Sequence, residues 1–160
     1  MTPHGAAPAL VLDTNVVLDW LVFADAPAVQ IGQLIADGTL RWIVTAAMQD
    51  ELQRVLGYPA LQQRDVDASA VWTRATQAWQ VVPTPPPMPA HWRLTSRDPD
   101  DQKFIDLAVS QRACGLLSRD KALLRLAGPA QQHGVEVATP QAWQRLPCMQ
   151  AGASVGAWPN

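Results

Sequence analysis

The chain has 160 residues, of which twelve are basic and fourteen acidic, and its formal net charge is −2. This length fits one domain, and a hydrophobic content of 48% is enough for a real core. The charge balance does not indicate a strongly basic nucleic-acid-binding protein, although a bound metal would change the sign locally. No apolar run reaches the ~18 residues of a membrane span, and the N-terminus lacks a signal-peptide pattern, so we expect no membrane association.

Short apolar runs alternate with helical patterns along the first half of the chain. Residues 1–8 predict a flexible start, and the run that follows predicts a buried strand, because a strand buried on both faces is continuously apolar. Thr45 is placed to cap the helix that follows the second strand. The expected elements are a strand at 9–13, helices at 15–21 and 26–36, a strand at 40–44, helices at 45–56 and 65–79, and a short strand at 81–82.

The second half of the chain opens with a proline-rich loop and then returns to the same alternation. Residues 83–89 contain five prolines, which predicts a stiff loop. The next expected elements are a helix at 100–113, a strand at 115–117, a helix at 120–126, a strand at 135–137 and a helix at 140–146. The Gly/Ala-rich tail, 147–160, is expected to be disordered. Alternating strands and helices predict one α/β domain over 9–146, with a mostly parallel sheet covered on both faces.

The two cysteines do not form a recognisable framework. Neither Cys114 nor Cys148 has a CxxC neighbour or a histidine at zinc spacing. Cys114 precedes an apolar run, so we expect a small buried core residue. A reducing cytoplasm is therefore the expected location.

Acidic residues stand where two of the predicted strands end. Asp13 follows the first strand, with Asn15 two residues later, and Ser118 and Asp120 repeat this arrangement after the strand at 115–117. Ligands of open α/β sheets bind beyond the carboxyl ends of the strands. Acids gathered there repel one another unless a hard cation, which prefers oxygen ligands, lies between them. The alternative is that Asp13 and Asp120 only cap the helices that follow.

A third group of acids lies in the segment Asp98-Pro99-Asp100-Asp101. Asp98 before Pro99 fits a helix cap followed by proline at the first helical position. Asp101, three residues past the cap, is best placed to turn toward the sheet. Glu51 lies inside a predicted helix, where it either faces solvent or reaches a shared metal.

Carboxylates around Mg²⁺ or Mn²⁺ suit phosphodiester hydrolysis. A metal lowers the pKa of bound water and offsets the charge that builds on the phosphorus oxygens. Lys103 and Arg119 lie among the acids and are candidate substrate contacts, and Trp92 is the tryptophan we expect to be exposed for base stacking. The three histidines lack partners at ligand spacing and are expected at the surface; they are His4, His91 and His133.

In their order and spacing, four segments resemble the motifs of PIN-domain ribonucleases. These segments are 11–18, 49–52, 98–108 and 116–124. The Asp-Pro-Asp-Asp pattern of the third segment is closest to the VapC-like branch of PIN-family toxins. The resemblance covers roughly residues 10–140; the proline-rich stretch before the third motif and the long tail depart from it.

The resemblance implies a three-layer α/β/α fold, Mg²⁺ or Mn²⁺ as cofactor, and endonucleolytic cleavage of single-stranded RNA. It also implies frequent homodimers and, in toxin members, a small antitoxin partner. The residues that match the acidic quartet are Asp13, Glu51, Asp101 and Asp120, with Asn15 and Ser118 at supporting polar positions and Asp98 as a possible addition.

Three other functions remain open from the sequence. A phosphohydrolase resembling the haloacid dehalogenases would use Asp13 as a nucleophile, but such enzymes require a second Asp at the position that Asn15 occupies here. A non-catalytic Mg²⁺-binding phosphoacceptor domain requires paired acids after the first strand, where this chain has only Asp13. A domain that binds RNA without cutting it would not need the intact quartet.

Overall fold

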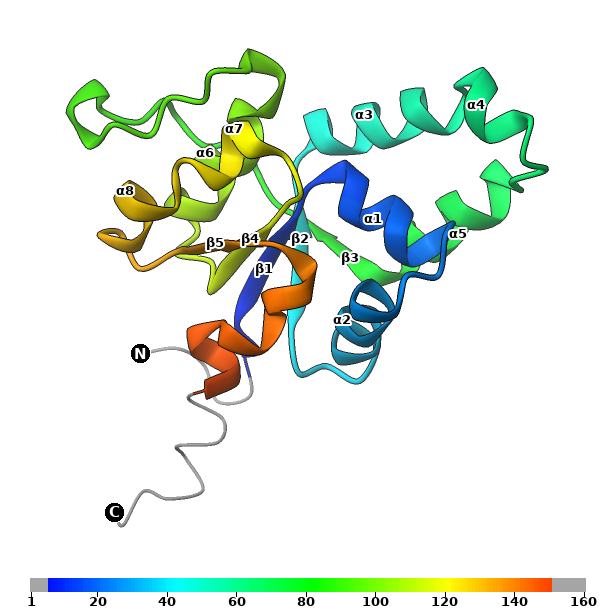
Figure 1. Cartoon of the computed structure of the whole chain (residues 1–160), viewed down its shortest axis with the longest axis horizontal. Coiled ribbons are helices and arrows are strands. Elements are labelled where there is room, and N and C mark those ends of the chain that lie inside the picture. Colours follow the sequence, from blue (N-terminus) through cyan, green and yellow to red (C-terminus); the bar gives the residue numbers. More distant parts are fainter. Residues whose placement is uncertain (1–5, 151–160) are drawn as a thin grey trace, which may run out of the picture.

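The computed structural model describes residues 6–150, and within this range it forms a sheet surrounded by helices (Figure 1). Residues 6–8 have no regular secondary structure. Residues 147–150 form a helical turn, so the prediction of disorder is wrong for that part of the tail. The rest of the two predicted flexible ends, 1–5 and 151–160, lies outside the described residues.

Five short strands form the sheet, and each is close to a predicted one. They are β1 (Ala9–Leu12), β2 (Arg41–Val44), β3 (Trp79–Val81), β4 (Gly115–Leu117) and β5 (Glu136–Ala138). The strand order is β3-β2-β1-β4-β5, and every neighbouring pair is parallel. The prediction of a parallel sheet is therefore confirmed.

Helices connect successive strands, as a parallel sheet requires. The α-helices are α1 (Thr14–Leu21), α2 (Ala26–Ala36), α3 (Ala46–Leu56), α4 (Pro59–Gln62), α5 (Ala68–Ala78), α6 (Gln102–Ser110), α7 (Lys121–Leu124) and α8 (Ala127–Gln131). Three 3₁₀ helices are η1 (Ala90–Trp92), η2 (Pro99–Asp101) and η3 (Pro140–Arg145).

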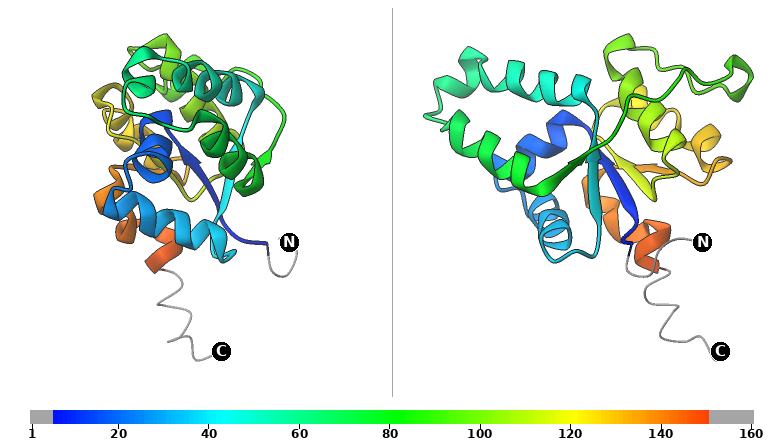
Figure 2. Two further views of the ribbon diagram at one scale, coloured as in Figure 1. Left: turned by 90° about the vertical axis from the view of Figure 1, so that its right-hand side faces the viewer. Right: turned by 180° about the vertical axis from the view of Figure 1, so that it is seen from behind.

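The helices form two groups around the strands. Helix α1 contacts α2, α3 and α5, whereas α6 contacts β1 and β4, and α8 contacts β5. Figures 1 and 2 show α1–α5 on one side of β1 and α6–α8 on the other, with the strands between them. This arrangement confirms the three-layer α/β/α architecture.

Two helical regions differ from the prediction. The helix expected at 65–79 is the shorter α5, because Asp67 starts α5 by accepting a hydrogen bond from the Ala70 amide and β3 begins at Trp79. Helix α4, just before it, was not predicted. Helix α8 was not predicted at all. Its sequence contains Gly128 and Pro129, which argue against a helix, but the first turn needs no amide donors and tolerates proline.

Tryptophans tie the helices to one half of the sheet. Trp42 on β2 is buried, and its ring lies 5.4 Å, centroid to centroid, from those of both Trp20 and Trp79. Trp79 in turn contacts Trp72 on α5 at the same centroid separation. Of these four rings, Trp42 lies fully in the core, and the other three are half-buried against it.

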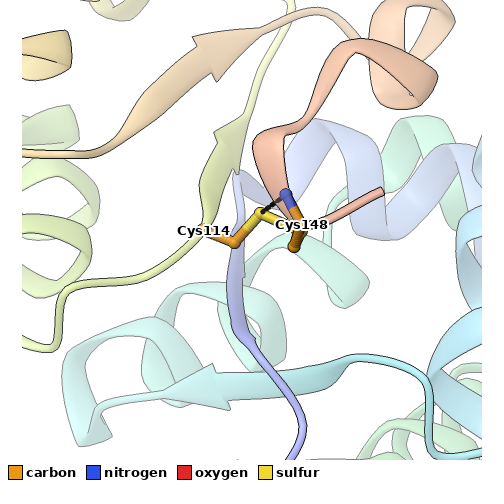
Figure 3. Close-up of a disulfide and its surroundings, with 2 residues drawn as sticks. All are labelled: Cys114 and Cys148. Carbon is orange, nitrogen blue, oxygen red and sulfur yellow. Dashed lines mark hydrogen bonds between the residues drawn. A yellow bond between two sulfur atoms is a disulfide. The ribbon is translucent and has the colours of Figure 1, made fainter. Parts of the chain in front are cut away.

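The prediction for the cysteines is wrong. Cys114 and Cys148 form a disulfide, with their Cα atoms 5.9 Å apart (Figure 3). Cys114 stands just before β4, at the opposite end of that strand from Ser118. The bond thus fastens the helical turn at 147–150 to the amino end of the sheet, a pairing 34 residues apart that short-range sequence patterns do not reveal.

Among the described residues, no helix has the length and apolar character needed to cross a membrane.

Candidate active site

Three carboxylates meet where β1 and β4 end. Asp13, Asp101 and Asp120 each place one oxygen within 4.8 Å of the other two. Strands β1 and β4 are neighbours, with Leu12 opposite Leu117, so the residues that follow them are brought side by side. The Asp13 amide extends this pairing by donating to the Leu117 carbonyl at 2.9 Å. We refer to these three residues as the carboxylate cluster.

Ser118 joins the two strand ends through its hydroxyl. The side chain is 0% exposed, and its Oγ donates to Asp13 Oδ2 at 2.6 Å. The same oxygen accepts a hydrogen bond from the Asp120 amide at 2.9 Å. Ser118 therefore fixes both Asp13 and the turn that carries Asp120.

The helix-cap alternative holds for one of the two strand-end acids. Asp120 Oδ1 accepts from the Ala122 amide at 2.8 Å, so Asp120 caps α7 and also offers an oxygen to the cluster. Asp13 occupies the cap position of α1 but makes no cap hydrogen bond with its side chain. Its carboxylate is 4% exposed and accepts from Ser118 instead.

The Asp98–Asp101 segment separates into capping and inward-facing acids, as predicted. Asp98 is exposed and caps η2 by accepting from the Asp100 amide at 3.0 Å. Asp100 is also exposed. Asp101 is only 9% exposed, and its Oδ2 atom is buried with no hydrogen-bond partner among the described residues. A buried, unpartnered carboxylate oxygen is costly, because nothing replaces the water it has lost.

The cluster is electrostatically unfavourable when it holds only protein atoms. Burial raises the pKa of Asp101 to about 7, and the nearby Asp120, Asp13 and Asp98 carboxylates act in the same direction. Burial also raises the pKa of Asp13; Glu51 and Asp120 add to this, whereas the Ser118 hydrogen bond opposes it. A divalent cation would lower both pKa values and satisfy the unpartnered oxygen of Asp101. The residues present therefore fit a metal ion.

Glu51 lies near the carboxylate cluster but is held by other groups. Its carboxylate accepts from the Thr14 hydroxyl and pairs with Lys103, whose Nζ lies 2.6 Å from Oε1. Lys103 also donates to the Asp100 carbonyl. The Glu51 side chain is 14% exposed, so it is not on a solvated helix face. Of the predicted quartet, the structure gathers three acids and places the fourth at their side.

The remaining predicted residues have varied surroundings. Asn15 is exposed at the start of α1, and its side chain makes none of the described side-chain hydrogen bonds. Arg119 makes a bidentate ion pair with Asp19, with Nε 2.8 Å from Oδ2 and Nη2 3.0 Å from Oδ1.

Trp92 is half-buried and stacks on His133, so the expectation of an exposed ring is wrong. Sequence reasoning missed Asp19, a buried acid on α1, because its partner lies 100 residues away.

The profile of the PIN domain matches residues 9–122, a segment that contains all three cluster carboxylates and Glu51. The chain belongs to the PIN domain family. PIN domains are nucleases that use divalent metals, which agrees with the chemistry of the carboxylate cluster.

Solved structures with this fold include two at low sequence identity. One is VapBC2 from Rickettsia felis, bound to a DNA fragment from its promoter, with a TM-score of 0.55 and 10% identity over 81% of this chain and 96% of that one. The other is PAE2754 from Pyrobaculum aerophilum, with a TM-score of 0.55 and 18% identity over 91% of this chain and 94% of that one. A search of the curated proteins found no match.

Proposed function

We propose that this PIN domain is a divalent-metal-dependent endoribonuclease that cleaves single-stranded RNA. The observation that carries the proposal is the cluster of Asp13, Asp101 and Asp120, whose oxygens lie within 4.8 Å of one another. The unpartnered Asp101 oxygen supports the same conclusion, because a cation between the carboxylates would satisfy it.

The cluster carboxylates would hold Mg²⁺ or Mn²⁺. Such an ion supplies a water of lowered pKa and offsets charge on the phosphate oxygens. Glu51 is near enough to influence Asp13 electrostatically and would act as the fourth acid. Asp98, at the exposed rim, would be an additional contact for a metal or its water shell.

The other residues of the site would position these acids. Ser118 aims the Asp13 carboxylate through a short hydrogen bond, and it also anchors the turn before α7. Lys103 holds Glu51 against the start of α6. Displacing Lys103 from Glu51 would free both a carboxylate for the metal and a cation for a substrate phosphate. Asn15, which is exposed beside Asp13, would contact bound RNA or solvent and not the metal.

We further propose that the chain is the toxin of a toxin–antitoxin pair. The Asp98-Pro99-Asp100-Asp101 segment and the fold shared with the Rickettsia felis VapBC2 structure support this assignment. A small antitoxin would cover the carboxylate cluster. The toxin itself is expected to form a homodimer. Co-expression with the product of a neighbouring small gene should give a complex whose nuclease activity is lower than that of the free chain.

The proposal is tested by incubating purified protein with unstructured and structured RNA, with Mn²⁺ or with chelator. We expect metal-dependent internal cleavage of the unstructured RNA, because a single strand can reach the recessed carboxylates. Asp13→Asn should lower the rate by at least about 100-fold, in the range seen when a catalytic electrostatic group is lost. Asp50→Asn, at an exposed acid next to Glu51, is the matched control and should cleave normally.

Two results would contradict the proposal. Cleavage that persists in chelator would show that the reaction does not need a metal ion. Equal activity of Asp13→Asn and the wild type would show that the carboxylate cluster is not the site of cleavage. A stable phosphoryl mimic on Asp13 would favour the phosphohydrolase or phosphoacceptor alternatives.

A further inference from the structure

The charges around the carboxylate cluster do not favour RNA binding. The chain carries a net charge of −2, and Asp98 and Asp100 add exposed negative charge at the rim of the site. Two of the cations near the site, Lys103 and Arg119, are already paired with Glu51 and Asp19, which leaves the exposed Arg97 and Lys121 beside it. RNA binding depends on cations that neutralise phosphates, so an additional unpaired cation outside the acidic site would strengthen RNA binding.

A hollow of about 690 Å³ between η1 and α8 offers basic and aromatic side chains, which the carboxylate cluster lacks. Its lining includes His91, Trp92 and Arg93 from the segment before α6, and Gln132 and His133 from the end of α8. None of the residues that line it is acidic. Figure 1 shows α8 and the green segment that precedes α6 on the same side of the molecule.

The aromatic side chains of the hollow are arranged in a stack. The Trp92 and His133 rings lie 4.3 Å apart, centroid to centroid, with a tilt of 35° between their planes. His91 meets Trp92 edge-on at 6.4 Å. The wall beside them is open, because even a Cβ added at Gly128 would meet no atom within 4 Å. A flat base could extend such a stack whatever its sequence.

Arg93 supplies the permanent positive charge of the hollow. It is exposed, and the ion pairs among the described residues involve other cations. Its backbone adopts the left-handed conformation, with φ 59° and ψ 37°, while its amide closes η1 by donating to the Ala90 carbonyl at 3.1 Å. Asparagine is one of the few non-glycine residues that adopt this conformation readily.

We infer that this hollow binds the part of a single-stranded RNA that flanks the scissile phosphate. A base stacks with Trp92 and His133, and Arg93 and His91 contact the adjoining phosphate. Arg93 is five residues from Asp98, so the two are at most about 18 Å apart along the chain, a distance that a few nucleotides span. The inference rests on the proposed nuclease function and adds a second substrate contact to it.

The test compares RNA binding and RNA cleavage in an Arg93→Asn variant. Asparagine tolerates the left-handed backbone, so the charge is removed without forcing η1 to change. Arg54→Gln, at an exposed arginine on α3, is the charge-matched control. A second variant, His91→Gln, removes an exposed ring without touching the core. Binding is measured in the non-cleaving Asp13→Asn background, with a long unstructured RNA and several salt concentrations.

The expected results separate the hollow from the carboxylate cluster. Arg93→Asn should weaken binding of the long RNA by roughly 10-fold or more, as expected for the loss of a charged hydrogen bond. It should also reduce the slope of log K against log salt by about 0.7, the value for one phosphate on a single strand. His91→Gln should weaken binding in the same direction. In the cleaving background, KM should rise for long RNA and stay unchanged for a dinucleotide.

Several outcomes would overturn the inference, and they differ from failure of the proposed function. If the wild type cleaves RNA but Arg93→Asn matches Arg54→Gln in affinity and salt slope, only the hollow is excluded as an RNA site. If the wild type neither binds nor cleaves RNA, the nuclease proposal fails and this inference fails with it. If the hollow binds polyglutamate in an Arg93-dependent way and does not bind RNA, it is a surface for an acidic protein.

Discussion

Single residues explain why the sheet edge is a site and not an ordinary helix-capping region. One acid beside a helix start is stabilising, but Asp13, Asp101 and Asp120 lie too close together for that benefit to extend to all three. Strongly shifted pKa values produced by burial and by a specific charged neighbour are typical of functional sites. Asp101, whose pKa is about 7, is the clearest case in this chain.

Replacing Asp101 with asparagine should stabilise the metal-free protein at high pH. The folded protein keeps a proton on Asp101 up to pH about 7, whereas the unfolded chain releases it near pH 4. Stability therefore falls as the pH rises between these values, and the neutral amide removes that loss. Thermal melts in chelator should show a larger gain for Asp101→Asn at pH 8 than at pH 5. A variant less stable than the wild type at pH 8 would identify Asp101 as a structural residue instead.

Ser118→Ala tests the bridge between β1 and β4. The substitution leaves Asp13 and the Asp120 amide without their shared partner in a buried region, which should cost about 1–3 kcal/mol in the free energy of unfolding. Urea titration measures this cost. Ser110→Ala, at an exposed serine near the end of α6, is the control and should lose less than about 0.5 kcal/mol. Equal losses in both variants would mean that the Ser118 bridge does not contribute to the free energy of unfolding.

At the residue scale, the sequence predicts which acids face inward better than it predicts their partners. The positions of Asp13 and Asp120 follow from the strands before them, and that of Asp101 follows from its offset from Pro99. The pairs Lys103–Glu51 and Arg119–Asp19 could not be predicted in this way. They depend on how α3 packs against α6 and on where α1 meets the end of β4.

At the scale of elements, continuous apolar runs identified most closely those strands that are buried on both faces. Strands β1 and β4 are buried along their whole length and were predicted within one residue. Short elements without such a run were harder to predict. Helix α8 was missed because its stability comes from contacts with β5 and not from its own sequence.

Gly32→Ala tests the packing of α2 against α1. A Cβ at Gly32 would overlap the Trp20 indole, so the ring must leave its place beside Trp42. Overpacking of this kind costs about 1–3 kcal/mol, even though alanine is the better helix former. Urea unfolding and the near-ultraviolet circular dichroism of the tryptophans should both change. Gly128→Ala, where a Cβ meets no atom within 4 Å, should leave the spectrum unchanged and should not lower stability. An unchanged Gly32→Ala variant would contradict the described helix contact.

At the scale of the whole molecule, topology brings the distant acids together. Asp13 and Asp120 are more than 100 residues apart in sequence, yet β1 and β4 are paired in the sheet. Alternating elements were enough to predict a parallel sheet with acids at its carboxyl edge, but not that β1 and β4 are neighbours. They gave no information on the Cys114–Cys148 bond, because disulfide pairing depends on the three-dimensional distance between two Cα atoms.

Removing the disulfide should destabilise the protein without stopping its activity. In the chain-entropy model, a bond that closes 34 residues contributes about 4 kcal/mol. Cys148→Ser should therefore lower the melting temperature, while RNA cleavage below that temperature stays normal, because Cys114 lies at the far end of β4 from Ser118. Wild-type protein treated with a thiol reductant should behave like the variant. An unchanged melting temperature would mean that the bond adds no stability.

Calorimetric titration of Mn²⁺ into metal-free protein is the most direct test of the carboxylate cluster. The wild type should bind the ion, and Asn substitution of Asp13, Asp101 or Asp120 should each weaken binding by at least about 10-fold, while Asp50→Asn should leave it unchanged. If the three cluster variants and the Asp50→Asn control all bind Mn²⁺ as the wild type does, the carboxylates at the ends of β1 and β4 are not a metal site.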